Sequence, residues 1–373
     1  MLSRRQFFRA AAVSAAVLPL PKDLLFAVEP QRRGGAPGGH DGQIILNSNE
    51  NAYGPFPSAM KAMQDGLRYA HRYPDSHYDA LYEGLAKHHN VKPENIWIGC
   101  GSGDVLRMAA DEFTGPGRPL VMGAPSFEEL GMYTQRRGGE VVKVPLRSSD
   151  QAHDLERMLA AAQSRPSLVY VCNPNNPTAS LTPRHEIEQF LKTLPGNATV
   201  IIDEAYHHFV TDPTYKSFAD RSADDPRVIV LRTFSKIYGL AGMRIGYGIS
   251  HPQTIEKLSK HYVYDNPNVV GTIGAIAGLA DSTALGAATK RIVDDRARFT
   301  AEAQKRKLKV IPSQANFIMF DSGKPVRQAI DFFKKQNVLI GRPFPPYDTH
   351  VRISLGLADE MQAFWRVWDQ YSA

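Results

Sequence analysis

The sequence predicts an α/β protein: a large domain on a mainly parallel seven-stranded sheet, followed by a small α+β C-terminal domain. Short apolar runs alternate with helical or loop stretches from residue 96 to about residue 250. This alternation is typical of a parallel sheet with helices on both faces and a site at the carboxyl ends of its strands. The seven strands are expected near Ile96, Leu120, Val141, Leu168, Val200, Val228 and Tyr247.

The pattern changes beyond Asn266, and this change sets the predicted domain boundaries. Residues 57–265 are expected to form the large domain, while residues 40–56 join residues 266–373 in the small one. Within the small domain, helices are predicted over about 285–309, 326–336 and 360–371, and strands over 316–320, 338–340 and 351–355.

The N-terminal segment has the features of a twin-arginine export signal. Residues 3–9 read SRRQFFR, and residues 10–18 form a mildly apolar run too short to span a bilayer. A basic arm followed by an alanine-rich helix is the alternative interpretation. Residues 30–39, rich in Gly, Pro and Arg, are typical of a flexible linker. Residues 1–39 are therefore assigned to a signal and linker, which predicts an exported, periplasmic protein that meets the twin-arginine translocase; no Ala-x-Ala motif marks a cleavage position.

Composition argues against two classes of site. Residues 1–39 hold six Lys/Arg and two acids, so that segment carries +4 of the total charge of +6 and leaves +2 for the rest, too little for a nucleic-acid protein. Cys100 and Cys172 are expected to be small buried thiols rather than a disulfide. The doublets His88-His89 and His207-His208 lack metal-ligand spacing and are expected to face solvent or line the substrate site, so no metal is predicted.

The most informative segment is TFSKIYGLAGMR, residues 233–244, which places a lysine eight residues before an arginine. A lysine that forms a Schiff base with pyridoxal phosphate (PLP) needs an anion-binding group for the phosphate at the far end of the ring. Thr233 and Ser235 offer hydroxyls, and Arg244 offers a planar fork of donors. A surface lysine beside an irregular loop is the alternative. The assignment of Lys236 as a Schiff-base lysine therefore depends on the other residues predicted to bind PLP.

Those partners follow two predicted strands. The strand VIID, residues 200–203, ends in Asp203, which can pair with the protonated pyridine nitrogen, and Tyr206 can reach the phenolic oxygen of the ring. Asn176, after the apolar strand 168–172, is a second donor to that oxygen. Singly these fragments are ordinary helix starts and turns; their order and their positions at strand ends carry the prediction.

A glycine-rich turn precedes them in IWIGCGSGDVLRMAA, residues 96–110. The strand breaks at Gly99 and a helix begins near residues 102–104, so free backbone N–H groups form an anion cradle. No lysine follows as in a Walker loop, and the glycine spacing does not match a dinucleotide fingerprint. Phe127 in APSF, residues 124–127, is available to stack on the ring.

Together these segments resemble the fold-type I PLP-dependent aminotransferases of class I/II, and most of all the histidinol-phosphate aminotransferase group. The similarity runs from about residue 44 to the C-terminus. Four further segments match: LNSNENAYGP at 46–55, RYPD at 72–75, QANF at 314–317 and VRISLG at 351–356.

The resemblance implies a role for each matching residue. Lys236 is the Schiff-base lysine and acts in catalysis with Asp203 and Tyr206. Tyr73 is similar to the tyrosine that reaches the cofactor phosphate of the partner subunit, which implies a homodimer. The cofactor would be bound by Ser102, Gly103, Phe127, Asn176, Asp203, Tyr206, Ser235, Lys236 and Arg244, and the substrate by Tyr53, Asn176 and Arg352, the last through its α-carboxylate.

Two departures from the family pattern bear on the substrate. His207-His208-Phe209 replaces the usual apolar residue and acid, and Arg342 lies about one position from the arginine that binds the phosphate of histidinol phosphate. With the export signal, these departures favour transamination between an amino acid (or derivative) and a 2-oxo acid, but not histidinol phosphate. A PLP-dependent decarboxylase or oxidase of the same fold is the alternative, and a non-catalytic PLP-binding module is a third.

Overall fold

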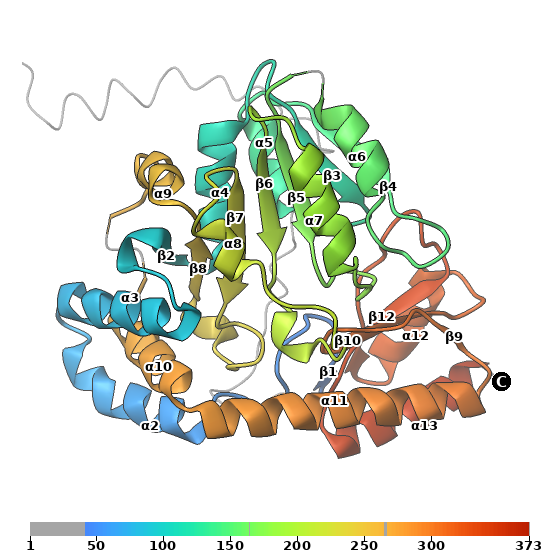
Figure 1. The fold of residues 1–373 in the computed structure, drawn as a ribbon. Coiled ribbons are helices and arrows are strands. Elements are labelled where there is room, and N and C mark those ends of the chain that lie inside the picture. Colours follow the sequence, from blue (N-terminus) through green and yellow to red (C-terminus); the bar gives the residue numbers. More distant parts are fainter. Residues whose placement is uncertain (1–41, 164, 265–266, 373) are drawn as a thin grey trace, which may run out of the picture. The chain divides into compact units, whose positions relative to one another are not determined.

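The computed structural model describes residues 42–163, 165–264 and 267–372, and Gln43–Ala373 forms one compact unit (Figure 1). The predicted export signal and linker lie outside the described residues. The expected division of the unit into a large and a small domain stays a prediction.

A seven-stranded sheet is the centre of this unit, in the strand order β2-β8-β7-β6-β5-β3-β4. Only β8 runs antiparallel to its neighbours, so the predicted α/β fold with a mainly parallel sheet is confirmed. All seven expected strands are present: β2 Ile96–Cys100, β3 Leu120–Ala124, β4 Val141–Pro145, β5 Leu168–Cys172, β6 Thr199–Asp203, β7 Val228–Thr233 and β8 Ile245–Ile249.

The two faces of this sheet bury different side chains, because successive residues of a strand point to opposite faces. Ile201 and Leu231 pack with helix α4 (Ser102–Phe113), and we call this side the α4 face. Ile202 and Val230 belong to a separate core on the opposite face. Further helices of this part are α5 Glu129–Arg136, α6 Leu155–Ala162, α7 Arg184–Thr193, α8 Ala219–Ser222 and α9 Pro252–Ser259.

The chain beyond the sheet forms a second, smaller set of strands. A three-stranded antiparallel sheet has the order β12-β10-β9, and β1 pairs with β11 in parallel, which joins residues 44–45 to the C-terminal part. The strands β10, β11 and β12 and the helices α12 and α13 lie within one or two residues of the expected elements, whereas β1 and β9 were not predicted as strands. Their bounds are β1 Ile44–Ile45, β9 Lys309–Val310, β10 Phe317–Asp321, α12 Val326–Lys335, β11 Val338–Leu339, β12 His350–Ser354 and α13 Ala358–Ser372.

The long helix α11 begins and ends a few residues earlier than the predicted helix over about 285–309. The helix before it, α10, is not predicted from the sequence. Helix α11 spans Ser282–Lys305 because the side chain of Asp281 accepts a hydrogen bond from the Ala284 N–H and caps it. Helix α10, Val269–Ala280, contains three glycines, which locally disfavour a helix. A Cβ on Gly274 would lie 2.6 Å from Cγ of Met63, so close packing against α2 (Pro57–Gly66) explains the glycine.

The remaining described helices are α3 Asp75–His89 and four short 3₁₀ turns, η2 Leu67–Tyr69, η3 Pro93–Asn95, η4 His207–Phe209 and η5 Ala241–Met243. Within the described ranges, each helix taken singly is too short or too polar to cross a bilayer. Helices α10 and α11 meet the length and hydropathy criteria only as a pair, and a bend of 84° separates them.

Candidate active site

The carboxyl ends of β5, β6 and β7 bring the predicted cofactor residues together. In the register of the sheet, Cys172 lies opposite Asp203, and Asp203 lies opposite Leu231. Tyr206 follows β6 and Lys236 follows β7, so both leave the sheet at the same edge as Asp203. Asp203, Tyr206 and Lys236 therefore lie close together, because parallel strands end at the same edge of the sheet.

Asp203 is a buried carboxylate without a cationic partner in the described part of the chain. Its Oδ2 accepts a hydrogen bond from the Tyr170 hydroxyl at 2.7 Å, and its Oδ1 accepts one from the Ala205 N–H at 3.0 Å. Burial raises the pKa of Asp203 to about 6, although these two hydrogen bonds act in the opposite direction. A cation placed beside Asp203 would therefore be strongly favoured.

The amino group of Lys236 lies in the same desolvated region. Nζ donates a hydrogen bond to the backbone oxygen of Asn49 at 3.1 Å and lies 5.5 Å from the centre of the Tyr206 ring. Burial lowers the pKa of Lys236 to about 8, and the positive charge of Arg352 adds to this effect. A useful fraction of this amine is therefore neutral near neutral pH, as nucleophilic and basic roles require.

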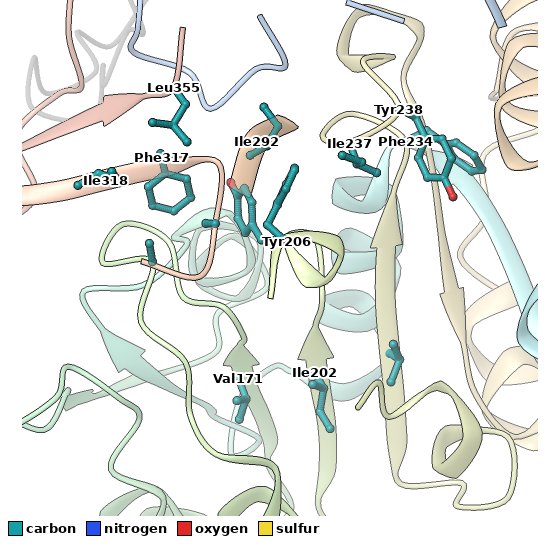
Figure 2. Packing of buried hydrophobic residues seen from close by; sticks show 14 of the residues in the cluster. Val171, Ile202, Tyr206, Phe234, Ile237, Tyr238, Ile292, Phe317, Ile318 and Leu355 are labelled. Carbon is teal, nitrogen blue, oxygen red and sulfur yellow. The ribbon is translucent and has the colours of Figure 1, made fainter. Parts of the chain in front are cut away.

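Asn49 and Asn316 were not singled out from the sequence, yet they organise this region. Asn49 Nδ2 donates to the Tyr206 hydroxyl at 3.1 Å, and its backbone oxygen accepts from both Lys236 and Asn316 Nδ2. Asn49 has φ of +54°, a conformation in which Asn is enriched. Figure 2 shows Tyr206 beside Phe317, and their ring centres are 5.0 Å apart. In the sequence, the only indication of a role for these two asparagines is that segments 46–55 and 314–317, which contain them, match the aminotransferase family.

The predicted phosphate cradle forms at the N-terminus of α4. A Cβ on Gly101, which has φ of +76°, would clash with the guanidinium of Arg244, so this glycine allows Arg244 to lie against the turn. Arg244 Nη1 lies 3.4 Å from Ser235 Oγ. A Cβ on Gly246 would clash with the backbone nitrogen of Ser102. Backbone N–H groups, a hydroxyl and a guanidinium therefore share one small space, as an anion requires.

Glu129 is an acidic group at this cradle that the sequence did not reveal. A Cβ on Gly103 would lie 2.7 Å from Glu129 Oε1, which also accepts a hydrogen bond from the Tyr133 hydroxyl at 2.7 Å. The negative charge of Glu129 contributes to the raised pKa of Asp203. An acid near the first turn of a helix is stabilised by the helix dipole.

Arg352 of β12 extends the site towards the C-terminal part. Its Nη1 donates to Asn176 Oδ1 at 2.7 Å, and its Nη2 donates to the backbone oxygen of Asn47 at 2.7 Å. Its Nε is buried without a partner, and no carboxylate of the described residues is among the groups that act on this guanidinium. Burial lowers the pKa of Arg352 to about 10. An unpaired buried guanidinium is suited to a carboxylate ligand.

Three other predicted site residues lie apart from these contacts. Phe127 is half-buried and packs against the core of the α4 face. The Tyr53 hydroxyl donates to Asp295 on α11 at 2.9 Å, while Arg291 stacks over its ring at 4.5 Å. Tyr73 is 77% exposed. The described contacts therefore do not bring Tyr53 or Tyr73 to Lys236.

The prediction for three of the four paired histidines was wrong. His89 Nε2 is hydrogen-bonded with the Tyr247 hydroxyl at 2.8 Å, and His208 packs edge-on against Tyr238. The charge of Arg232 acts on all three of these histidines, and their ring contacts are with residues of the core on the face opposite α4 rather than with the predicted cofactor residues. Burial, reinforced by Arg232, lowers the pKa of His89 and of His207 to about 2, and it also lowers the pKa of His208 well below its usual value. His88 is exposed, as expected.

The cysteine prediction agrees with the structure only in part. Cys172 is buried and Cys100 is half-buried, and both are free thiols. Burial raises the pKa of Cys172 well above the usual range of a thiol. No cluster of potential metal ligands is found among the residues that the structure describes.

Comparison with known proteins identifies the family. The model of the family "Aminotransferase class I and II" matches residues 41–364. The chain belongs to this family. The histidinol-phosphate aminotransferase of Moorella thermoacetica is 37% identical over 87% of this chain and 84% of its own length, and the aromatic amino acid aminotransferase of Rhodococcus jostii is 38% identical over 87% and 88%. Among solved structures, histidinol-phosphate aminotransferase from Sinorhizobium meliloti in complex with pyridoxal 5′-phosphate has a TM-score of 0.82 and 30% identity, covering 88% of this chain and 91% of that one.

The predicted enzyme class and cofactor are therefore confirmed: the protein is a PLP-dependent aminotransferase of fold-type I. Its residues fit the cofactor, since the glycine cradle, the Arg244 guanidinium and the unpaired Asp203 carboxylate match a phosphate and a pyridinium. Bound PLP supplies an electron sink that acidifies the Cα–H of an amino acid. Lys236 Nζ would hold the cofactor and then carry the Cα proton, and Arg352 would orient the substrate carboxylate.

Proposed function

We propose that this aminotransferase moves the amino group between an amino acid, or an amino-acid derivative, and a 2-oxo acid, and that histidinol phosphate is not its substrate. Arg352 carries the first part of the proposal, because it is a buried guanidinium with a free Nε whose charge acts on Lys236, whereas the exclusion of histidinol phosphate rests on the export signal and on Arg342. A carboxylate bound there would be held by planar, paired donors that a lysine cannot reproduce. Arg342, which would be needed for a substrate phosphate, is bound to Glu128 instead.

The test is a comparison of kcat/KM for an amino-acid panel with kcat/KM for histidinol phosphate, with 2-oxo acid, amine, ammonia and peroxide analysed as products. Keto acid without amine or peroxide is expected. The Arg352→Lys variant should lose about a hundredfold in kcat/KM for amino acids, since one of two carboxylate hydrogen bonds to a charged group is lost. Efficient turnover of histidinol phosphate would overturn the substrate proposal, and amine or peroxide as the main product would point to the decarboxylase or oxidase.

We also propose that the enzyme is exported. The support is the sequence of residues 1–39, with Arg4 and Arg5 before an apolar run. Replacement of Arg4 and Arg5 by lysine should leave the enzyme in the cytoplasm, whereas the native sequence should deliver activity to the periplasm. Equal distribution of both forms on cell fractionation would contradict this proposal.

The active unit is proposed to be a homodimer. Tyr73 is 77% exposed and Leu67 is 61% exposed, which fits side chains that another copy of the chain covers. Mixed dimers of Tyr73→Ala and Lys236→Ala chains should recover activity, since one site would keep both residues. A fully active monomer in light scattering would contradict the proposal.

A further inference from the structure

The ion pair between Glu128 and Arg342 lies next to the proposed substrate carboxylate site, and neither the sequence nor the family comparison assigns a role to Glu128. Arg342 Nη2 donates to Glu128 Oε2 at 2.7 Å, and 214 residues separate the two in the chain. Glu128 follows Phe127 directly, and Arg342 follows β11. The pair therefore joins the loop before α5 to the C-terminal part.

We propose that Glu128 is a specificity-determining residue that selects substrates with uncharged side chains. It holds Arg342 and places a negative charge where the anionic side chain of a dicarboxylic or phosphorylated substrate would bind. This inference rests on the proposed role of Arg352 as the binder of the α-carboxylate.

Both arginines contact the ring of Phe344, which limits the distance between them. The guanidinium carbon of Arg342 lies 4.4 Å from the ring centre and that of Arg352 lies 4.6 Å from it, so the two carbons are at most 9.0 Å apart. The charge of Arg342 contributes to the lowered pKa of Arg352. A substrate whose α-carboxylate is bound by Arg352 would therefore lie within the electrostatic reach of Arg342.

Arg342 would stay in this position without Glu128. Its guanidinium stacks on Phe344, which is buried, and its Nη1 donates to the backbone oxygen of Pro343 at 3.1 Å. Removal of the Glu128 charge would therefore expose a second cation beside Arg352 instead of dispersing it. Native Glu128 cancels this cation and repels a second anion.

The pair is open to water, which limits the size of the effect. The Arg342 side chain is 56% exposed and the Glu128 side chain is 53% exposed, so salt and solvent weaken both the attraction and the repulsion. We therefore expect discrimination of about two- to fivefold rather than a complete exclusion of anionic substrates.

The experiment measures equilibrium binding of two substrate-like carboxylates, glutarate and 3-phenylpropionate, to the PLP-loaded enzyme. Glu128→Gln should raise the affinity for glutarate relative to 3-phenylpropionate by about two- to fivefold, and the gain should shrink at high salt. Adding Arg342→Gln should cancel it. The matched control is Glu94→Gln, which removes a second exposed, ion-paired acid, in this case one paired with Lys92, and should leave the ratio unchanged.

Binding makes the test independent of turnover, and the ratio of kcat/KM for glutamate over phenylalanine should move in the same direction. An unchanged binding ratio in Glu128→Gln, or an equal gain in the Glu128→Gln/Arg342→Gln double variant, would overturn the inference. Failure of the proposed function would show differently, as absence of keto acid from every amino acid of the panel.

Discussion

Asp203 and Glu204 are consecutive buried carboxylates on opposite faces of one sheet, and their surroundings differ. Asp203, on the α4 face, is bonded only by the Tyr170 hydroxyl and the Ala205 N–H. Glu204 pairs with Arg232 Nε at 2.9 Å and also accepts hydrogen bonds from the side chains of Ser217 and Tyr215 and from the Phe218 N–H. The charge of Glu204 is thus neutralised within the chain, whereas that of Asp203 is available to a ligand.

The neighbouring ionisable groups follow the same division. On the Glu204 side, His89, His207 and His208 are held neutral around Arg232 by burial. On the Asp203 side, Lys236 has a pKa of about 8 and Arg352 lacks a carboxylate partner among the described residues. One face is a closed network that stabilises the fold, and the other holds charges that the fold leaves for cofactor and substrate.

The largest expected effect is a loss of activity without a loss of stability when Asp203 is replaced. Asp203→Asn should lower kcat of the PLP-saturated enzyme by roughly a thousandfold, because the carboxylate that would face the pyridine nitrogen is lost. The Tm of the cofactor-free protein at pH 8 should stay equal or rise, since a buried, unpaired charge is removed. Near-normal kcat with full cofactor occupancy would contradict the assigned role.

Glu204→Gln should give the opposite result. Arg232 would be left buried without its carboxylate, so the free energy of unfolding should fall by about 3–5 kcal/mol, while kcat per folded molecule changes little. Denaturant unfolding measures the first quantity and active-site titration corrects the second, with Glu94→Gln as the surface control. A loss below about 1 kcal/mol would show that the pair is not central to this face.

The reactivity of Lys236 provides a third comparison. Because burial lowers its pKa to about 8, the rate of PLP capture by the cofactor-free protein should rise with pH and level off above pH 8. At pH 7 the neutral fraction exceeds that of an ordinary lysine, with a pKa near 10.4, by about a hundredfold or more. Stopped-flow absorbance measures the profile, and a midpoint near 10 would show that the amine is not desolvated.

The histidines should produce the smallest effect, in acid. Their folded pKa lies below the unfolded value of 6.5, so the unfolded chain binds more protons below pH 6.5 and stability falls as the pH falls. Each histidine contributes up to about 1.4 kcal/mol per pH unit. His207→Gln should flatten the dependence of Tm on pH between 6.5 and 5, whereas the exposed His71→Gln should not. Equal slopes in all three proteins would contradict the account.

The sequence by itself determined the sheet and the main chemical groups of the site. A buried parallel strand requires a short, continuous run of apolar residues, which can be recognised locally in the sequence. Such runs end in Asp203 and lead into Ser235-Lys236. The same holds for the glycines before α4, because a tight turn at a helix N-terminus limits the residues that fit. These features could be predicted before any contact was known.

Only the tertiary structure decided which groups are partners. Asn49 lies 187 residues from Lys236, and Glu128 lies 214 residues from Arg342, so neither contact leaves a local pattern. Helix α10 shows the same limit, since its glycines locally disfavour a helix and the packing of Met63 against Gly274 is visible only in the tertiary structure. Some buried charges are paired within the chain, as that of Glu204 is, and others are left for a ligand, as that of Asp203 is. Which of the two occurs depends on the groups that the fold places beside the charge. Two adjacent acids of nearly equal intrinsic chemistry therefore acquire different roles from the face of the sheet on which each one lies.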